Sequence, residues 1–283
     1  MSTDQRNSPP FFRGLNRVML SLGPLADGQH CPYQCAFCYV VHGFGRYASL
    51  SVPELVNAVK ACPSTYDIIY VSGDTDSFAP PRTDMGIDLL DQLSTLGVDI
   101  LFTTRTTFGA QHLDRIAEIA QKLARSGLLL FGCISIPRLD SGAHLESANT
   151  PSTRARIATL RDLKQRNLTT VLTLRPFLPT IPVQEYLEII SLCEAFTDIV
   201  LGEYWYADVA GVIEQRVFRG PTPKEVDFVL RQMDFDENTN WWKVWEGREV
   251  ERAVRDYCAA AGLPFFMRSR PAVDHARRIR SRR

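Results

Sequence analysis

Six short apolar runs alternate with amphipathic stretches between residues 17 and 201, and this alternation constrains the fold more than any other feature. The runs are nearly continuous and rich in β-branched or bulky residues, which is typical of strands buried on both faces. Repeated strand–helix units predict parallel strands joined by right-handed crossovers, and therefore an α/β fold. The predicted strands are 17–22, 67–71, 98–102, 128–136, 169–174 and 198–201.

Helical periodicity fills the stretches between these runs, and the first helix has a start signal in Ser51, Pro53 and Glu54. Six strand–helix units predict a partial (β/α)6 TIM-like barrel with its chemistry at the carboxyl ends of the strands. The predicted helices are 52–61, 86–96, 111–126, 152–167 and 182–195.

Beyond residue 215 the pattern turns mainly helical, at 223–233 and 248–261, and it ends in a short apolar run at 263–267. We expect a helical closing element on the barrel, with the tryptophan-rich run at 241–245 packed among its helices. A chain of 283 residues with 45% hydrophobic residues can bury one large core. The predicted parts are an N-terminal extension (1–16), the barrel (17–215), the closing element (216–270) and a basic tail (271–283).

The charges of the chain balance, with 32 basic and 32 acidic residues, so no global charge attracts the protein to DNA or an anionic membrane. Residues 268–283 nevertheless hold seven arginines and one acidic residue. We interpret them as a solvated, frayed terminus, and a contact with nucleic acid or an acidic partner is the alternative. No apolar stretch reaches membrane-spanning length and no signal-peptide run opens the chain, which predicts a cytoplasmic protein without a membrane partner.

Three of the seven cysteines, Cys31, Cys35 and Cys38, lie close together after the first predicted strand. Clustered thiols in a chain with such a core indicate metal or redox chemistry rather than a disulfide scaffold. Three thiolates on one loop can bind three irons of a cubane cluster and leave the fourth iron open to a small ligand. A zinc site, with His30 or His42 as fourth ligand, and unrelated thiols are the alternatives.

The CxxxCxxC spacing of these cysteines, with an aromatic residue before the last one, resembles the signature of the radical S-adenosylmethionine (SAM) superfamily. The resemblance implies an oxygen-sensitive [4Fe–4S] cluster on Cys31, Cys35 and Cys38, whose open iron binds SAM. It also implies that the reduced cluster cleaves SAM to methionine and a 5′-deoxyadenosyl radical, which takes hydrogen from a substrate. A flavodoxin or ferredoxin is the expected electron donor.

The resemblance covers residues 18–270 and in its details is similar to the spore photoproduct lyase-like branch. Ser72, Gly73 and Asp74 stand where radical SAM barrels carry a Gly-Gly-Glu-like turn that meets the methionyl amine, and a glycine there lets backbone approach a ligand. Arg105 stands where that branch has a basic residue for the SAM carboxylate, which it could hold by a bidentate contact. A plain β/α turn and a surface arginine are the alternatives.

Two later segments are similar to the Ser-Ile-Asn and Phe-Glu-Pro-Gly-Thr segments of the same branch. Ser135 in the first is a candidate for a hydrogen bond to SAM, and Glu146 in the second for a charge contact near the SAM amine. Arg175, at the end of the fifth strand, is a second candidate partner for the SAM carboxylate.

The chain also departs from the lyase branch. The photoproduct lyases carry a hydrogen-donating cysteine just before the turn after the second strand, and Val71 holds that place here. Phe37 stands where a tyrosine is typical, whereas Tyr39 is kept and is a catalytic candidate. Cys133 is a candidate substitute hydrogen donor if it points inward, and a buried structural cysteine is the alternative.

Asp76, Glu203 and Trp205 are the candidates for the substrate pocket. Because side chains alternate along a strand, Glu203 and Trp205 should share one face at the end of the sixth strand. Core packing is the alternative for the aromatic residues.

The features together predict a radical SAM enzyme that acts on a small molecule, such as a natural-product or nucleoside intermediate. Repair or modification of a nucleic acid is the first alternative, and a non-catalytic iron–sulfur or zinc-binding module is the second. Val71 argues against repair chemistry, and the SAM-binding candidates on several strands argue against the non-catalytic module.

Overall fold

The computed structural model of the chain describes most of its 283 residues, and the side chains from residue 16 onward. The chain divides into two compact units. The first comprises Met1–Tyr33, Phe44–Cys133 and Asp162–Thr169, and the second comprises Gln34–Gly43, Ile134–Arg161 and Thr170–Arg283. The described residues are 11–14, 16–23, 31–40, 50–62, 65–73, 75–139, 141–232 and 241–280.

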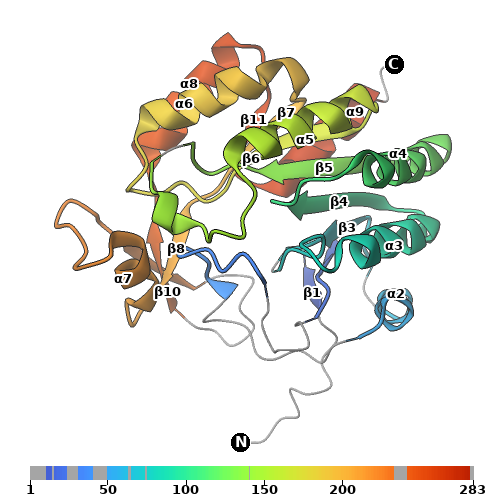
Figure 1. Ribbon diagram of the computed structural model, residues 1–283, viewed down its shortest axis with the longest axis horizontal. Coiled ribbons are helices and arrows are strands. Elements are labelled where there is room, and N and C mark those ends of the chain that lie inside the picture. Colours follow the sequence, from blue (N-terminus) through green and yellow to red (C-terminus); the bar gives the residue numbers. More distant parts are fainter. Residues whose placement is uncertain are drawn as a thin grey trace, which may run out of the picture. The chain divides into compact units, whose positions relative to one another are not determined.

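The main sheet has the strand order β1-β2-β3-β4-β5-β6-β7-β11 (Figure 1). β1 is antiparallel to β2, whereas β2–β3, β3–β4, β6–β7 and β7–β11 are parallel pairs. This order and direction are those of the predicted partial (β/α)6 barrel, so the predicted α/β fold class is confirmed. The strands are β1 (Phe11–Gly14), β2 (Arg17–Leu20), β3 (Ile68–Val71), β4 (Asp99–Thr104), β5 (Leu130–Ser135), β6 (Thr169–Leu174), β7 (Ile199–Gly202) and β11 (Phe265–Phe266).

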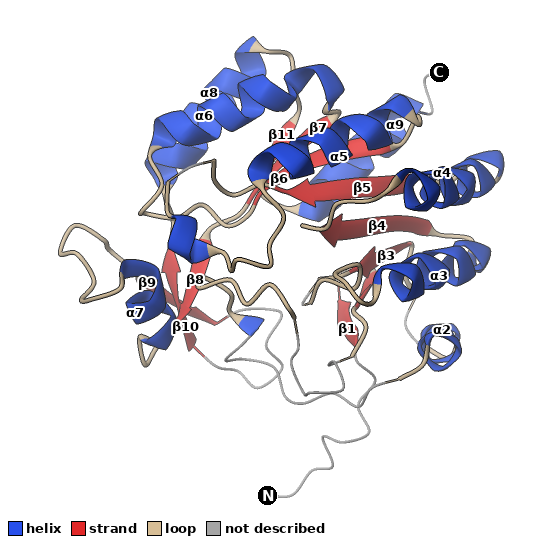
Figure 2. Cartoon of the chain, viewed as in Figure 1, coloured by secondary structure: helices blue, strands red, loops and turns tan. Residues whose placement is uncertain are grey.

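The first unit carries the helices α2 (Val52–Lys60), α3 (Thr83–Leu93) and α4 (Ala110–Arg125), which pack side by side (Figure 2). The predicted start signal of α2 is confirmed, because the Glu54 carboxylate accepts hydrogen bonds from the Ser51 backbone N–H at 2.7 Å and from its hydroxyl at 2.6 Å. α3 begins three residues earlier than predicted. Ser94–Leu96, which were predicted to be the last residues of this helix, form a separate 3₁₀ helix.

The helix α5 (Thr153–Gln165) begins in the second unit and ends in the first. Within the second unit, α6 (Val183–Cys193) and α8 (Arg248–Ala260) pack against each other (Figure 1). The predicted helices at 152–167, 182–195 and 248–261 are therefore confirmed, with boundaries that differ by one or two residues.

A second, three-stranded antiparallel sheet lies in the second unit, in the order β8-β10-β9. Its strands are β8 (Trp205–Asp208), β9 (Val229–Gln232) and β10 (Trp241–Trp245). The predicted helix at 223–233 is therefore wrong in its described part, and the tryptophan-rich run forms a strand instead of packing among helices. Burial alternates along β10, and its three tryptophans and one valine are residues that favour a strand.

The basic tail is not frayed up to residue 280, contrary to the prediction, because it forms α9 (Ser269–Arg280). Ala272 and Val273 are buried on this helix, and Arg270 forms an ion pair with Asp274 one turn later, at 3.1 Å. β1 was not predicted, since it falls in the expected N-terminal extension. The predicted domain boundaries stay predictions. Within the described part of the chain, no helix has the length and apolar character needed to cross a membrane.

Candidate active site

The turn that follows β3 is bound to the exit of β2 by short hydrogen bonds. The Ser72 N–H donates to Leu20 O at 2.8 Å, and the Thr75 hydroxyl donates to Leu22 O at 3.2 Å. In return the Leu22 N–H donates to Ser77 Oγ at 2.9 Å. The two strand ends are thus fixed in register immediately before the segment that leads to Cys31.

Ser72 adopts a φ of +66°, a left-handed conformation that is uncommon for a residue with a side chain. Its hydroxyl accepts the Ser77 N–H at 3.0 Å, which helps to hold this conformation. Gly73 is exposed, and a Cβ there would lie 2.6 Å from the flexible end of Met19. Asp74 lies outside the described residues. The SAM-binding roles of Ser72, Gly73 and Asp74 stay predictions.

Asp76 joins this turn to the end of β4. Its carboxylate accepts the Thr104 hydroxyl at 2.9 Å, the Arg105 N–H at 2.7 Å and the Phe78 N–H at 3.0 Å. Burial raises the pKa of the Asp76 carboxyl, and these hydrogen bonds oppose the rise. The carboxylate is buried and occupied by internal donors, so its contacts do not support the predicted place in a substrate pocket.

Cys31 sits beside this carboxylate in the first unit. The backbone N–H groups of Asp76 and Tyr33 lie near its thiol and act to lower its pKa. The larger influences, burial first and then the Asp76 charge, raise the pKa of the Cys31 thiol above its ordinary value. The Arg105 charge acts in the opposite direction and lowers this pKa. Arg105 is therefore within electrostatic reach of Cys31, as expected of a residue that serves the same site. Tyr33 is tied to Thr106 by a hydrogen bond of 2.7 Å between the two hydroxyl oxygens.

Cys35 and Cys38 belong to the second unit, where a tight turn joins them. The Cys38 N–H donates to Cys35 O at 3.0 Å. Ala36, between them, donates its N–H to Leu145 O at 2.9 Å. The second half of the cysteine loop is thereby hydrogen-bonded to the 3₁₀ turn η3 (Ala143–Leu145).

Tyr39, directly after Cys38, contacts the three-stranded sheet. Its ring makes edge-to-face contacts with Tyr206 of β8 and Trp242 of β10, with centroid separations of 6.2 and 6.1 Å. The closing part of the chain therefore touches the cysteine loop through an aromatic cluster. The catalytic role of Tyr39 stays a prediction.

The chemistry of the donors fits an iron–sulfur cluster. All seven cysteines carry a thiol rather than a disulfide, so the three sulfurs of the CxxxCxxC loop are available in reduced form. A cluster iron at Cys31 would supply the positive partner that a buried thiolate needs. Among the described residues, no three His, Cys, Asp or Glu side chains already converge as a metal site. His30 and His42, the ligands of the zinc alternative, lie outside those residues.

Cys133 and Ser135 lie on the same face of β5. A Cβ added at Gly132 would lie 3.0 Å from Leu163 of α5, so position 132 faces that helix. Alternation then turns Cys133 and Ser135 away from α5, to the inner face of the strand. Both are buried, and the predicted condition for Cys133 as a hydrogen donor, an inward orientation, is met.

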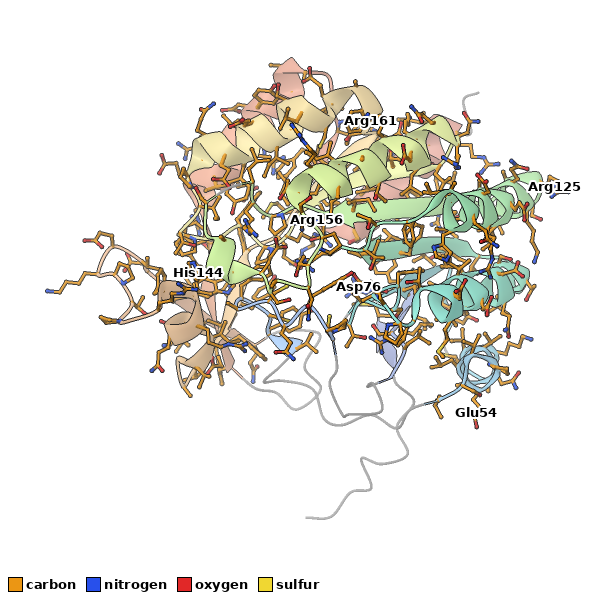
Figure 3. All side chains as sticks on the ribbon, viewed as in Figure 1. Glu54, Asp76, Arg125, His144, Arg156 and Arg161 are labelled. Carbon is orange, nitrogen blue, oxygen red and sulfur yellow. The ribbon has the colours of Figure 1, made fainter. Side chains whose placement is uncertain are left out.

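Glu146 is buried in an ion pair. Its carboxylate oxygens accept hydrogen bonds from Arg156 at 2.9 and 2.7 Å, and Arg138 Nε lies 3.1 Å from one of them. Two guanidinium groups around one carboxylate would repel a cationic amine. These contacts do not support the predicted role of Glu146 beside the SAM amine, and they identify Arg156, labelled in Figure 3, as the bidentate partner of Glu146.

Arg175 already has protein partners, because it donates to Gly202 O at 3.2 Å and to Ser269 Oγ at 2.9 Å. It links the ends of β6 and β7 to the start of α9. Its predicted role at the SAM carboxylate stays a prediction, as does that of Arg105.

Glu203 and Trp205 differ in exposure. Glu203 is half-buried, and its carbonyl accepts the Phe177 N–H at 2.8 Å. Trp205 is fully buried, and its ring packs against Phe218 and Phe228 at centroid distances of 5.9 and 5.6 Å. The core-packing alternative therefore describes Trp205 better than a place in the substrate pocket.

Two buried arginines were missed by the sequence reasoning. Arg82 donates to Gly23 O at 2.5 Å and to Asp76 O at 3.2 Å, and it thereby links the turn after β3 to the segment after β2. Arg156 shares the buried face of α5 with Leu160 and Leu163. An arginine at helical spacing from two core leucines is a signal that could have revealed Arg156, because such a position demands a charged partner.

The comparisons with known proteins agree with this geometry. Residues 26–193, more than half of the chain, match the family described as the radical SAM superfamily. No curated protein sequence matches the chain.

Two kinds of solved structure have a similar fold. Spore photoproduct lyase, solved with a dinucleoside spore photoproduct, has a TM-score of 0.61 at 13% identity over 88% of this chain and 82% of that one. The radical S-adenosylmethionine methyltransferase TsrM from Kitasatospora setae, solved with cobalamin and a [4Fe–4S] cluster, has a TM-score of 0.51 at 12% identity. That match covers 87% of this chain and 52% of TsrM. The cysteine loop after β2, the parallel β/α fold and the family match lead to one conclusion: the chain belongs to the radical SAM superfamily and is an enzyme that uses a [4Fe–4S] cluster and SAM.

Proposed function

We propose that the enzyme takes a hydrogen atom from a small-molecule substrate, of the natural-product or nucleoside class, after reductive cleavage of SAM. The observation that carries this proposal is the cysteine loop itself. Its three thiols have the family spacing. Cys31 lies near the turn after β3, the Cys35–Cys38 half is hydrogen-bonded to the turn η3 after β5, and both turns follow parallel strands. Such turns lie where β/α folds place their chemistry.

In this proposal Cys31, Cys35 and Cys38 hold the cluster, and Arg105 and Ser135 bind SAM. The bound cluster supplies the electron that splits SAM into methionine and a 5′-deoxyadenosyl radical, which then takes the substrate hydrogen. Arg105 supports the carboxylate assignment because its charge already acts on Cys31. Superfamily enzymes need a reductant, and we infer a flavodoxin or ferredoxin as the donor.

The residue at the end of β3 favours a small molecule over a damaged nucleic acid. Val71 is buried there, and it cannot return a hydrogen atom to a product radical. Cys133 is the thiol that we propose in its place, because it lies on the inner face of β5 and is fully buried. A buried donor suits a small substrate that the protein encloses rather than a duplex that must dock from outside.

Deuterium transfer tests the proposal directly. Candidate small molecules, deuterated at carbon, are incubated with reduced, reconstituted enzyme and SAM, and the label in 5′-deoxyadenosine is measured. Deuterium in 5′-deoxyadenosine, with substrate-dependent product, is the expected result. A set of labelled oligonucleotides is the comparison, and label from them alone would replace the small-molecule assignment with nucleic-acid chemistry.

Repair or modification of a nucleic acid is the second candidate function, and the similarity in fold to spore photoproduct lyase favours it. The arginines at the end of α9 would then contact phosphates. Oligonucleotide affinity would fall with salt, with a slope of roughly 0.7 to 0.9 per phosphate contact, and Arg277→Gln, Arg278→Gln and Arg280→Gln together would flatten it by about 2 units. We expect weak binding at low salt, little at physiological salt and turnover unchanged by the three substitutions.

A further inference from the structure

The strongest unexplained feature of the second unit is a buried arginine. The side chain of Arg156 is 1% exposed, as is that of its partner Glu146. A charge so deeply buried is unfavourable unless each of its hydrogen-bonding groups is used in good geometry. Replacement of such a pair by apolar residues is often neutral or stabilising, so the pair itself is weak evidence for a role in stability alone.

The contacts of Arg156 run to three separate segments. Nη1 donates to Ser135 O at 2.8 Å, at the end of β5, as well as to Glu146. Nη2 donates to the other Glu146 oxygen and, at 3.3 Å, to Thr153 Oγ1. The Thr153 hydroxyl in turn donates to Arg138 O at 3.0 Å. One guanidinium group therefore holds the end of β5, the segment after η3 and the start of α5.

The segment held by Glu146 leads directly to the cysteine loop. Leu145, its neighbour, is fully buried and accepts the N–H of Ala36, which lies between Cys35 and Cys38. Gly142 closes the turn with a φ of +62°, and a Cβ at that position would lie 2.4 Å from Leu145 Cδ1.

His144 holds the other side of the same turn, since its Nε2 lies 2.9 Å from Val217 O of α7 (Val212–Phe218) (Figure 3). The turn is thus held by three independent contacts: the His144 hydrogen bond, the buried Leu145 side chain and the Arg156–Glu146 pair. A shift of Glu146 would be transmitted through one peptide to the carbonyl that receives the Ala36 N–H.

We propose that Arg156 is a positioning residue for the cofactor site, which fixes the Cys35–Cys38 half of the loop through Glu146 and the end of β5 through Ser135 O. The inference rests on the proposed function, because it presumes that these cysteines hold the cluster. Only a planar guanidinium can serve both carboxylate oxygens and the Ser135 carbonyl at once. A lysine would keep the charge and lose this geometry.

A double variant separates positioning from stability. Arg156→Met with Glu146→Met removes both buried charges together, which keeps the fold close to wild-type stability. The matched control is Leu160→Ala, one turn along the same face of α5, which opens a cavity at a buried position and leaves Arg156 and Glu146 unchanged. The measurements are thermal unfolding, the rate of iron loss to a chelator from the reconstituted protein, and SAM affinity.

We expect the double variant to lose iron to the chelator about 10- to 100-fold faster than the wild type, or to bind SAM about 10- to 100-fold more weakly. This is the range known for residues that orient metal ligands. Leu160→Ala should unfold at a lower temperature and lose iron at the wild-type rate. Wild-type iron retention and SAM affinity in the double variant would overturn the inference, as would iron loss in Leu160→Ala equal to that of the double variant.

Arg156→Lys provides a second test that does not depend on how the double variant folds. The positioning role predicts faster iron loss or weaker SAM binding in this variant, and wild-type behaviour would overturn it by showing that charge alone suffices. Failure of the proposed function is distinguishable, because the wild-type protein itself would then neither assemble a four-iron cluster nor cleave SAM.

Discussion

The two halves of the cysteine loop are held by different kinds of interaction. Cys31, in the first unit, lies beside the Asp76 carboxylate, whose hydrogen bonds come from a hydroxyl group and two backbone N–H groups. The turn containing Cys35 and Cys38, in the second unit, is hydrogen-bonded next to a carboxylate that two guanidinium groups neutralise.

The difference shows two ways to keep a buried carboxylate beside the cysteine loop. Burial raises the pKa of Asp76, and the hydrogen bonds from uncharged groups, together with the Arg105 charge, only oppose that rise. Paired guanidinium groups supply the counter-charge, but they make the site depend on one or two long side chains. We therefore expect the second half of the loop to be more sensitive to a single substitution than the first.

The largest expected effect is that of Arg156→Met alone. Glu146 would remain buried beside Arg138 with its bidentate partner gone, and breaking a buried pair by removing one member costs about 3 to 5 kcal/mol. Urea unfolding of the apoprotein measures this loss. A change below about 1 kcal/mol, as is usual for exposed ion pairs, would remove the contrast between the two halves of the loop.

A smaller effect is expected for Asp76→Asn. The amide keeps one acceptor oxygen but points an NH2 group at either the Arg105 or the Phe78 N–H, and a buried unsatisfied donor costs about 1 to 3 kcal/mol. The same unfolding experiment measures it, with Thr104→Val as the control that removes one hydroxyl donor and keeps the carboxylate. Stability equal to wild type in Asp76→Asn would show that the neutral hydrogen bonds do not anchor the Cys31 side.

The smallest effect concerns the aromatic contact of Tyr39. A double-mutant cycle with Tyr39→Leu and Trp242→Leu should give a coupling energy of about 0.5 to 1.5 kcal/mol, as is usual for edge-to-face pairs. Such a value would show that the three-stranded sheet supports the cysteine loop. Additive losses would mean that the sheet and the loop are energetically independent, despite their 6.1 Å ring separation.

The sequence predicted the repetitive parts of this fold well, since period-2 and period-3.6 patterns are local. It failed at β9, where the antiparallel partner β10 decides the conformation of a segment with no strong pattern of its own. It also placed Glu146 after β5 but did not predict its protein partner. That partner, Arg156, lies on a helix ten residues later, and only packing brings the two together. The superfamily was recognised from the spacing of Cys31, Cys35 and Cys38, and the role of these three residues as cluster ligands stays a prediction.

The most direct test of the account compares the wild-type protein with Cys35→Ala after anaerobic reconstitution and reduction. We predict about four irons and four sulfides for each wild-type chain, with 5′-deoxyadenosine formed from SAM. Cys35→Ala should lose the intact cluster and form no 5′-deoxyadenosine while keeping a cooperative unfolding transition. Stoichiometric zinc without iron in the wild-type protein, or SAM cleavage by Cys35→Ala at the wild-type rate, would contradict the central claim that this loop holds the catalytic cluster.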